Sequence, residues 1–203
     1  MAEARWVAVI GALFITGYDE LAVLQNFNGR AVEQNIGETA RHGAELAVDA
    51  ALAGGFSARL AYTFIGAVVG QAYSTCVGTP CLAAMVAAGS RLPAVPENAL
   101  YAGVSWAYAP LGFSTTLEAQ GRARIYADDR NTASAAGYWE LNWRGGFEQE
   151  TKGWRFSEFG RLDNLANRAY VGSVIVDESN SRYFEPAPGR TGYIMFTAAW
   201  RVK

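Results

Sequence analysis

Few residues in this 203-residue sequence have the types and spacing that chemistry requires. Cys76 and Cys81 both lie in the predicted loop 70–96, and in an oxidising exterior we expect them to form a disulfide that braces this loop. A metal site is not expected there, because no histidine or second cysteine pair is nearby. The sequence shows no nucleophile–base pairing, phosphate-binding glycine loop or catalytic pair of carboxylates, so we expect neither an enzyme nor a bound cofactor.

Two other polar features have ordinary explanations. The run Asp128, Asp129 and Arg130 could hold a cation or a substrate, but a solvated loop tip is the simpler interpretation. His42 is the single histidine and falls on the apolar side of its predicted strand. We therefore expect His42 at an interface rather than in a ligand-binding role.

Composition narrows the class of protein. The net charge is −2 and no Lys/Arg run stands out, so nucleic acid is not an expected partner. Twenty-two glycines, only six prolines and many short alternating runs favour an all-β fold. The one long apolar run, Trp6–Ile15, is too short for a membrane-spanning helix. It lacks a positive region before it and a cleavage site after it, so it is interpreted as a strand and not as a signal peptide.

Apolar and polar residues alternate along about eight segments, the pattern of strands with one apolar and one polar side. In the segment Phe113–Ala127, for example, Leu117 and Ile125 share one side while Glu118 and Arg122 share the other. A helix would scatter these charges around its whole circumference. The predicted strands are Arg5–Leu24, Val32–Asp49, Phe56–Val68, Asn98–Ala109, Phe113–Ala127, Gly137–Glu150, Trp154–Gly172 and Gly189–Lys203, with a polar loop Ser173–Pro188 before the last.

The connections between these strands alternate in length. Those at 53–55, 110–112 and 151–153 are tight, whereas those at 25–30, 70–96, 128–136 and 173–188 are longer. Consecutive antiparallel strands would place every tight turn at one rim and every longer loop at the other. Outer-membrane β-barrels have this asymmetry, with short turns on the periplasmic side.

Aromatic residues on the apolar sides gather near the rim of the tight turns. Such a girdle is expected at a bilayer interface, where amphipathic rings are most stable. Its predicted members are Trp6, Trp106, Tyr108, Phe113, Phe147, Trp154 and Trp200. A soluble ligand-binding barrel of the lipocalin kind is the alternative, and it would turn its apolar sides inward.

The charged residues on the polar sides would face the lumen of a membrane barrel, where they line water, contact a plug or pair with one another. They are Arg41, Glu45, Arg59, Glu118, Arg122, Arg124, Glu140 and Arg144. One exception concerns Arg155 and Glu158, which are three residues apart and so fall on opposite sides of a regular strand. One of the two must face lipid unless a bulge intervenes.

Three sequence stretches near the carboxyl end occur in a familiar order. They are Arg161-Leu162-Asp163-Asn164-Leu165, Arg168-Ala169-Tyr170-Val171-Gly172-Ser173 and Tyr183-Phe184-Glu185-Pro186-Ala187-Pro188-Gly189-Arg190. Together with Arg91-Leu92-Pro93-Ala94-Val95-Pro96, they resemble the carboxy-terminal part of the β-barrel of TonB-dependent outer-membrane receptors. Structural roles are expected for Arg161, Asp163, Asn164, Tyr170, Glu185, Pro186, Gly189 and Arg190.

This resemblance implies a barrel of about 22 strands around a folded plug, in the outer membrane of a Gram-negative bacterium. It also implies import of a scarce ligand such as a ferric siderophore, haem or cobalamin, driven by periplasmic TonB in a full-length protein. Residues 1–203 would then be a partial barrel without a plug or signal peptide, inactive alone and dependent on missing upstream strands. The end Arg201-Val202-Lys203 departs from the terminal aromatic expected in the family.

Elementary physics limits what eight strands can do alone. An open sheet in lipid would leave two edges of unpaired backbone groups, each costing several kcal/mol. Eight strands could instead close on themselves around a lumen just wide enough for side chains. Such a barrel would have a structural or adhesive role, and this alternative stays open at the level of sequence.

Overall fold

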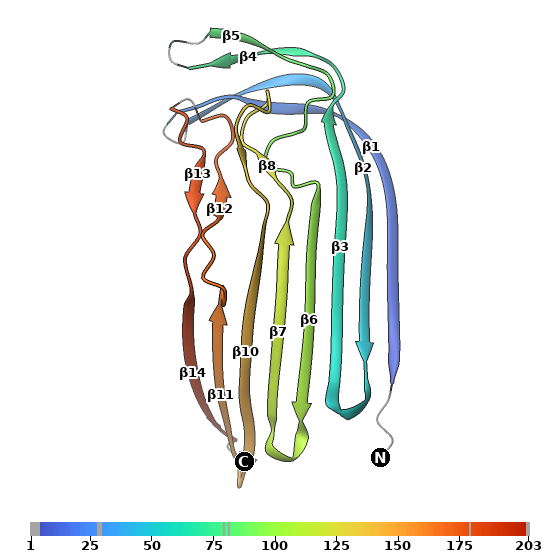
Figure 1. Ribbon diagram of the computed structural model, residues 1–203, viewed down its shortest axis with the longest axis vertical. Coiled ribbons are helices and arrows are strands. Elements are labelled where there is room, and N and C mark those ends of the chain that lie inside the picture. Colours follow the sequence, from blue (N-terminus) through green and yellow to red (C-terminus); the bar gives the residue numbers. More distant parts are fainter. Residues whose placement is uncertain (1–4, 28–29, 79, 81, 179, 202–203) are drawn as a thin grey trace.

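The computed structural model describes residues 5–27, 30–78, 80, 82–178 and 180–201. Its main feature is one sheet of eight antiparallel strands in the order β1-β2-β3-β6-β7-β10-β11-β14 (Figure 1). These strands are β1 (Trp6–Phe27), β2 (Arg30–Ala51), β3 (Phe56–Val69), β6 (Asn98–Tyr108), β7 (Phe113–Arg122), β10 (Tyr138–Thr151), β11 (Trp154–Asp163) and β14 (Thr191–Trp200). The predicted all-β, up-and-down arrangement is confirmed.

The sheet is open. Its edge strands β1 and β14 each pair with a single neighbour, β2 and β11, among the described residues. Figure 1 shows the two edge strands on opposite sides of the sheet. The alternative in which the eight strands close on themselves is therefore wrong, and the fold matches a section of a larger barrel.

Three tight turns connect strands at one end of the sheet, as predicted. They are built by the short helices η1 (Ala53–Gly55) and η2 (Ala109–Leu111) and by the pair Lys152 and Gly153. Glycines 54, 55, 112 and 153 have positive φ angles, which glycine adopts without a side-chain clash. Both described chain ends lie at this end of the sheet (Figure 1).

The longer connections at the other end contain more structure than the sequence indicated. Small two-stranded sheets form from β4 (Tyr73–Val77) and β5 (Leu82–Val86), from β8 (Ile125–Tyr126) and β9 (Ser134–Ala135), and from β12 (Val171–Val174) and β13 (Phe184–Pro186). The loop predicted at 70–96 is thus partly a hairpin. Such short strands were missed because their pairing depends on contacts with the rest of the loops and not on a long alternating pattern.

Several predicted boundaries were wrong. A turn was expected at 25–30, but β1 and β2 stay paired as far as Phe27 and Arg30, and Asn28 and Gly29 lie outside the described residues. The strand predicted to reach Gly172 ends at Asp163, because Asn164 adopts a left-handed conformation with φ of 52° and turns the chain. The last strand ends at Trp200, and residues 202–203 lie outside the described part.

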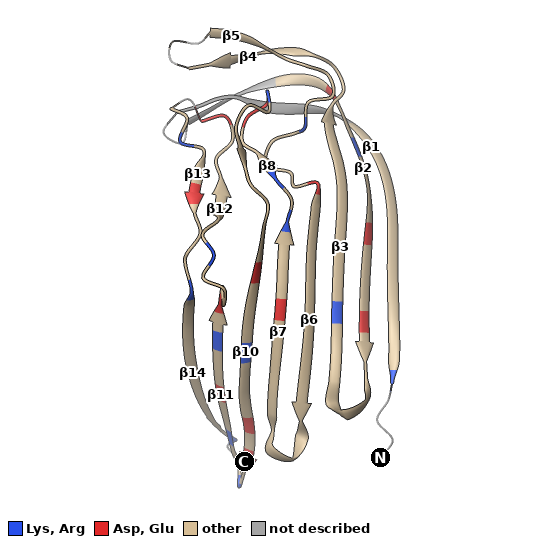
Figure 2. Ribbon diagram, viewed as in Figure 1, with Lys and Arg blue, Asp and Glu red and all other residues tan. Residues whose placement is uncertain are grey.

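Burial across the sheet is inverted relative to a soluble protein. Leu117 and Leu141 are 51% and 42% exposed, whereas Glu118 and Glu140, which point to the opposite side, are each 7% exposed. The side bearing Glu118 and Glu140 is called the polar face below, and the side bearing Leu117 and Leu141 the apolar face. Figure 2 shows charged residues along β2, β3, β7, β10 and β11, while β6 and β14 carry none. A lipocalin-like barrel with its apolar sides inward is inconsistent with this arrangement.

The buried apolar core lies under the loops and not against the sheet. Its members come from the loop ends of β2 and β3, from the β4–β5 hairpin and from the segment that follows it. They are Ile36, Ala67, Val69, Tyr73, Val86 and Leu92. The loops at this end therefore pack on one another. No helix in the described part of the chain is long and apolar enough to cross a membrane.

Candidate functional site

Glu118 is the centre of a charged cluster on the polar face. Its Oε1 accepts a hydrogen bond of 3.0 Å from the Tyr101 hydroxyl and lies 3.2 Å from Nε of Arg144. Its Oε2 lies 3.7 Å from Nη2 of Arg161. These side chains come from the four neighbouring strands β6, β7, β10 and β11. The nearly buried carboxylate is thus compensated by two guanidinium groups, as a buried charge requires.

Glu140 is the centre of a second cluster, closer to the loops. Its Oε1 accepts hydrogen bonds from Nε2 of Gln120 at 2.5 Å and from Nδ2 of Asn142 at 2.8 Å. Its Oε2 accepts a hydrogen bond from the hydroxyl of Tyr170. Gln120 is the register partner of Glu140 on β7, whereas Tyr170 comes from the segment after β11. Glu140 therefore fixes a loop segment to the sheet.

That loop segment folds back over the polar face. The ring of Tyr170 stacks on Tyr138 with 3.9 Å between centroids, and the Arg122 guanidinium lies 4.9 Å from the centre of the Tyr138 ring. Arg122 also donates to the carbonyl oxygens of Val171 and Gly172, at 3.1 and 3.0 Å. Burial, reinforced by the adjacent Glu140 carboxylate, raises the pKa of the Tyr170 phenol, so this residue stays a hydrogen-bond donor.

Arg161, Asp163 and Asn164, from the first of the three sequence stretches, organise the turn that begins this segment. Arg161 Nε donates to Asp163 Oδ1 at 2.7 Å. Asn164 is 2% exposed, and its backbone N–H donates to Oδ1 of Asn142 at 2.8 Å. Its side chain accepts from the Arg168 N–H and donates to the Arg168 carbonyl, at 2.9 and 2.8 Å. Asparagine tolerates the left-handed conformation found here and satisfies the turn's backbone groups at the same time.

The remaining motif residues lie on the return path to β14. The backbone N–H of Arg190 donates to Oδ1 of Asn167 at 2.9 Å, and its guanidinium donates to the Leu165 carbonyl at 2.5 Å. A Cβ at Gly189 would lie 3.1 Å from that same Asn167 oxygen, so the chain passes closely there. Glu185 and Pro186 are exposed on β13, opposite Ser173 and Val171 of β12.

The other charges predicted on the polar sides are placed as follows. Arg59 on β3 forms an ion pair with Asp49 on β2, with 2.6 Å between Nε and Oδ1. Arg41 donates to Thr39 Oγ1 at 3.0 Å, and Glu45 lies between Ala12 and Thr63 in register. The placement of Arg124 on the strand of Glu118 was wrong, because β7 ends at Arg122 and Arg124 lies exposed between β7 and β8.

Aromatic side chains on the apolar face gather in a band near the tight turns, in two groups of contacting rings. Trp106 stacks on Tyr108 and meets Phe113 edge-on, with centroids 6.0 and 5.9 Å apart. Phe113 packs against Phe147 at 4.9 Å. Farther along the sheet, Trp154 and Trp200 are register partners and stack with 5.8 Å between ring centroids.

Trp6 does not join this band, and its predicted place there was wrong. It pairs in register with Ala51, and it lines a cavity together with Asp49, Arg59 and Tyr101 of the polar face. Both sides of the first strand are apolar in sequence, so periodicity could not decide its orientation. Only the pairing with β2 does so.

Comparison with known proteins agrees with this architecture. A family model described as TonB dependent receptor-like, beta-barrel, matches residues 5–165. The chain belongs to this family. The match covers most of the sequence and spans the strands that hold both carboxylate clusters.

Solved structures of similar fold include two receptors and a copper transporter. The siderophore receptor PiuA from Acinetobacter baumannii aligns with a TM-score of 0.72 and 18% identity over 96% of this chain and 27% of its own. The ferric yersiniabactin uptake receptor FyuA from Yersinia pestis aligns with a TM-score of 0.68 and 20% identity, over 96% of this chain and 28% of its own. The copper transporter OprC aligns with a TM-score of 0.66 and 14% identity, over 95% of this chain and 29% of its own. This TonB-dependent receptor-like chain therefore spans between 27% and 29% of the length of these proteins.

In this receptor-like barrel segment, the loop end holds a group of buried carboxylates. Asp128 and Asp129 are 7% and 3% exposed, so the prediction of a solvated loop tip was wrong. The N–H of Asp129 donates to Oδ1 of Asp177 at 3.1 Å, and the N–H of Asp177 donates to the Ala127 carbonyl at 2.9 Å. No group of three or more His, Cys, Asp or Glu side chains in the described ranges is arranged to hold a metal ion.

The pair Asp129 and Asp177 makes the docking of these loops depend on pH. Burial, and then the Asp129 charge, raises the pKa of Asp177 from 3.8 to about 8, and burial also raises that of Asp129. Between about pH 4 and pH 8 the docked state therefore binds more protons than the undocked state, so docking weakens as pH rises.

Hydrogen exchange at the Asp177 amide should quicken over this range beyond its intrinsic pH dependence. Asp177→Asn should reduce that excess, leaving the part due to Asp129, and an unchanged excess in the variant would contradict the assignment.

Two further predicted residues lie outside these clusters. Cys76 is disulfide-bonded, and Cys81, the other cysteine of the sequence, lies outside the described residues. His42 is exposed on the apolar face, and its ring meets Phe64 edge-on at 6.0 Å. Asn142 was not singled out as a functional candidate, although it is 2% exposed and its hydrogen bonds connect Glu140 to the turn at Asn164. The sequence did offer a signal for this residue, because Asn142 lies between Glu140 and Arg144 on the polar side of the alternating pattern.

Proposed function

We propose that this chain forms one wall of a TonB-dependent transporter in the outer membrane of a Gram-negative bacterium. The observation that carries the proposal is the inverted burial of the sheet, with exposed leucines on one face and buried, fully partnered glutamates on the other. A lipid-facing barrel wall requires an apolar outer surface and tolerates charge on its inner surface. The polar face accordingly lines the lumen, and the apolar face meets hydrocarbon.

The two ends of the sheet then have distinct surroundings. The tight turns face the periplasm, and the aromatic band around Trp106, Phe113 and Trp154 lies at the headgroup level of the inner leaflet. The loops that hold Asp129, Asp177 and Cys76 face the exterior, where a disulfide between Cys76 and Cys81 persists. Loop docking at Glu140 and Asn164 shapes the outer mouth of the lumen.

The open edges and the polar face require partners. Strands outside residues 1–203 pair with β1 and β14, because a lipid-exposed edge would leave backbone groups unsatisfied. A plug domain occupies the lumen and contacts the clusters of Glu118 and Glu140. Periplasmic TonB acts on that plug in the complete protein. The present chain then supplies wall and loops, and is inactive by itself.

The ligand class we infer is a scarce metal chelate or similar compound, such as a ferric siderophore, haem or cobalamin. Support comes from the similar structures, since PiuA is a siderophore receptor, FyuA is a ferric yersiniabactin uptake receptor and OprC is a copper transporter. The carboxylates of Glu118 and Glu140 on the polar face are held by arginine, tyrosine and amide partners. Such structural pairing fits a role in transport and not in catalysis.

Uptake by the native bacterium tests this function. Deletion of the gene should abolish energy-dependent uptake of radioactive iron from at least one chelate in a panel of siderophores and haem, or of radioactive cobalamin. Restoring the gene should restore uptake, and a protonophore or loss of TonB should abolish it again. Unchanged uptake of every compound, or uptake that persists without TonB, would count against the proposal.

A further inference from the structure

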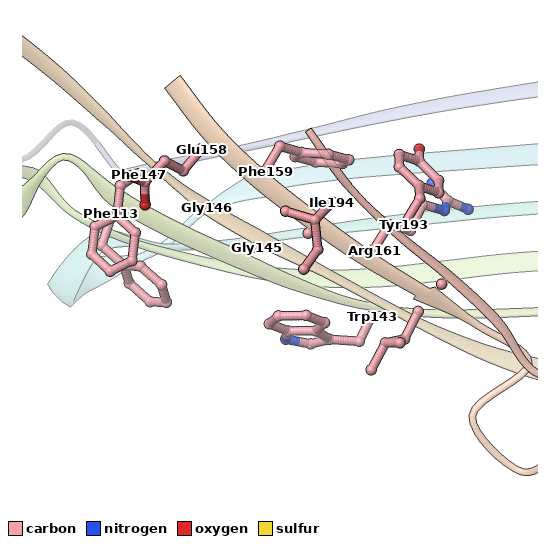
Figure 3. A pocket seen from close by; sticks show the side chains of 13 residues that line it. Phe113, Trp143, Gly145, Gly146, Phe147, Glu158, Phe159, Arg161, Tyr193 and Ile194 are labelled. Atoms are coloured by element: carbon pink, nitrogen blue, oxygen red, sulfur yellow. The ribbon is translucent and has the colours of Figure 1, made fainter. Parts of the chain in front are cut away.

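The apolar face is hollowed by a groove of about 730 Å³ across β10, β11 and β14. Its floor is made by Gly145 and Gly160, which are register partners, and by Gly192, the partner of Leu162. Trp143 leans over this strip, since a Cβ at Gly160 would lie 3.8 Å from its ring. Figure 3 shows Trp143 and Phe113 on one side of these strands, and Phe159 and Tyr193 on the other.

Glu158 lies at the end of this groove nearest the tight turns. It stands between Phe147 of β10 and Phe196 of β14, its two register partners. Pairing of β10 with β11 is regular throughout, so no bulge turns Glu158 away from the apolar face. Arg155 points to the polar face instead, where it forms an ion pair with Glu148.

Glu158 is therefore an isolated charge in apolar surroundings. On the described strands β3, β6, β7, β10, β11 and β14 it is the one charged side chain of the apolar face. No hydrogen bond or ion pair joins it to another described residue. A carboxylate in such surroundings needs a cationic or hydrogen-bonding partner, because burying an unpaired charge in hydrocarbon is very costly.

We propose that this groove binds the acyl chain of a phospholipid whose primary-amine headgroup pairs with Glu158. The inference rests on the proposed function, because it takes the apolar face as the membrane surface. A protonated amine supplies both the positive charge and the N–H donors that Glu158 lacks within the chain. The glycine floor supplies the space that an acyl chain fills.

The position of Glu158 along the strand fits this ligand. Glu158 is the register partner of Phe147, which packs against Phe113 in the aromatic band, so its carboxylate is level with the band and near the lipid headgroups. From Glu158 the groove runs toward Leu162 and Gly192, away from the tight turns. A lipid of the periplasmic leaflet with its headgroup at Glu158 would extend its chain in this direction.

Lipid titration of the protein purified in detergent from outer membranes tests the proposal. Dioleoyl phosphatidylethanolamine, phosphatidylcholine and phosphatidylglycerol are added separately, and bound lipid is counted by native mass spectrometry. The acyl chains are identical, and only phosphatidylethanolamine carries an amine with N–H donors. The wild type should retain it at least about fivefold more tightly than either other lipid, a difference of about one ion pair. Equal retention of the three lipids would overturn the proposal.

Two variants separate the headgroup from the chain. Glu158→Gln should remove the preference for phosphatidylethanolamine, whereas Glu150→Gln, at the tight-turn end of β10, should keep it. Gly160→Leu should fill the floor without a backbone clash, and should weaken retention of all three lipids. Heat-modifiable migration on a gel verifies folding of each variant, and the comparison of lipids on the wild type stands even if a variant misfolds.

The outcomes also distinguish this inference from the function on which it rests. A protein found in the outer-membrane fraction with no preference among the lipids would overturn the lipid site alone. A protein soluble without detergent would overturn both. A dimer that Glu158→Gln dissociates would show that a second copy, and not a lipid, covers the groove.

Discussion

Replacing Gly112 by alanine should lower the free energy of unfolding by about 3 kcal/mol. Gly112 closes the turn between β6 and β7 with φ of 62°, a conformation that costs an ordinary residue about 1–2 kcal/mol. A Cβ there would also overlap the carbonyl oxygen of Glu148 and lie 2.9 Å from its carbonyl carbon. Relieving that overlap adds about 1–3 kcal/mol, and it breaks the 2.9 Å bond from the Glu148 N–H to the Gly112 carbonyl. Urea unfolding of the detergent-solubilised protein measures the loss.

Gly54 provides the matched control. It also has a positive φ, of 71°, but the nearest atom to an added Cβ is Phe56 Cδ2 at 3.8 Å. Gly54→Ala should therefore lose only the conformational part, about 1–2 kcal/mol. Equal losses in the two variants would show that the contact with Glu148 relaxes without cost.

Replacing Glu140 by alanine should destabilise the protein by about 3 kcal/mol and release the loop segment after β11. The change removes the acceptor of Gln120, Asn142 and Tyr170 at a site where Glu140 is 7% exposed. Buried donors without partners cost about 1–3 kcal/mol each, and part of this cost is recovered when Tyr170 swings out to solvent. Trypsin cleavage after Arg168 measures the release, and it should quicken by at least about tenfold.

Two variants calibrate this result. Glu140→Gln keeps one acceptor oxygen and should lie between wild type and alanine. Glu45→Ala removes a glutamate from the polar face of β2, where the side chain is exposed, and should change cleavage after Arg168 by less than about twofold. If Glu45→Ala accelerated cleavage as much as Glu140→Ala, general charge on the polar face would be responsible instead of the contacts at Glu140.

The amino-acid sequence alone determined the strands and their two faces. Side chains of a strand alternate with period two, so the separation of Leu117 from Glu118, or of Leu141 from Glu140, follows from their order in the chain. The tight turns followed as well, because Gly54, Gly112 and Gly153 mark positions where the chain reverses with positive φ. These features depend on residues close together in sequence.

Tertiary structure decided everything that depends on residues far apart in sequence. The orientation of Trp6 required pairing with Ala51, since both faces of its strand are apolar. Burial of Asp129 against Asp177, and the return of Tyr170 onto Glu140, required loops that pack over a core including Val69 and Val86. No periodic pattern encodes such contacts, because loop conformation follows from the packing and hydrogen bonds that become available only when the whole sheet has assembled.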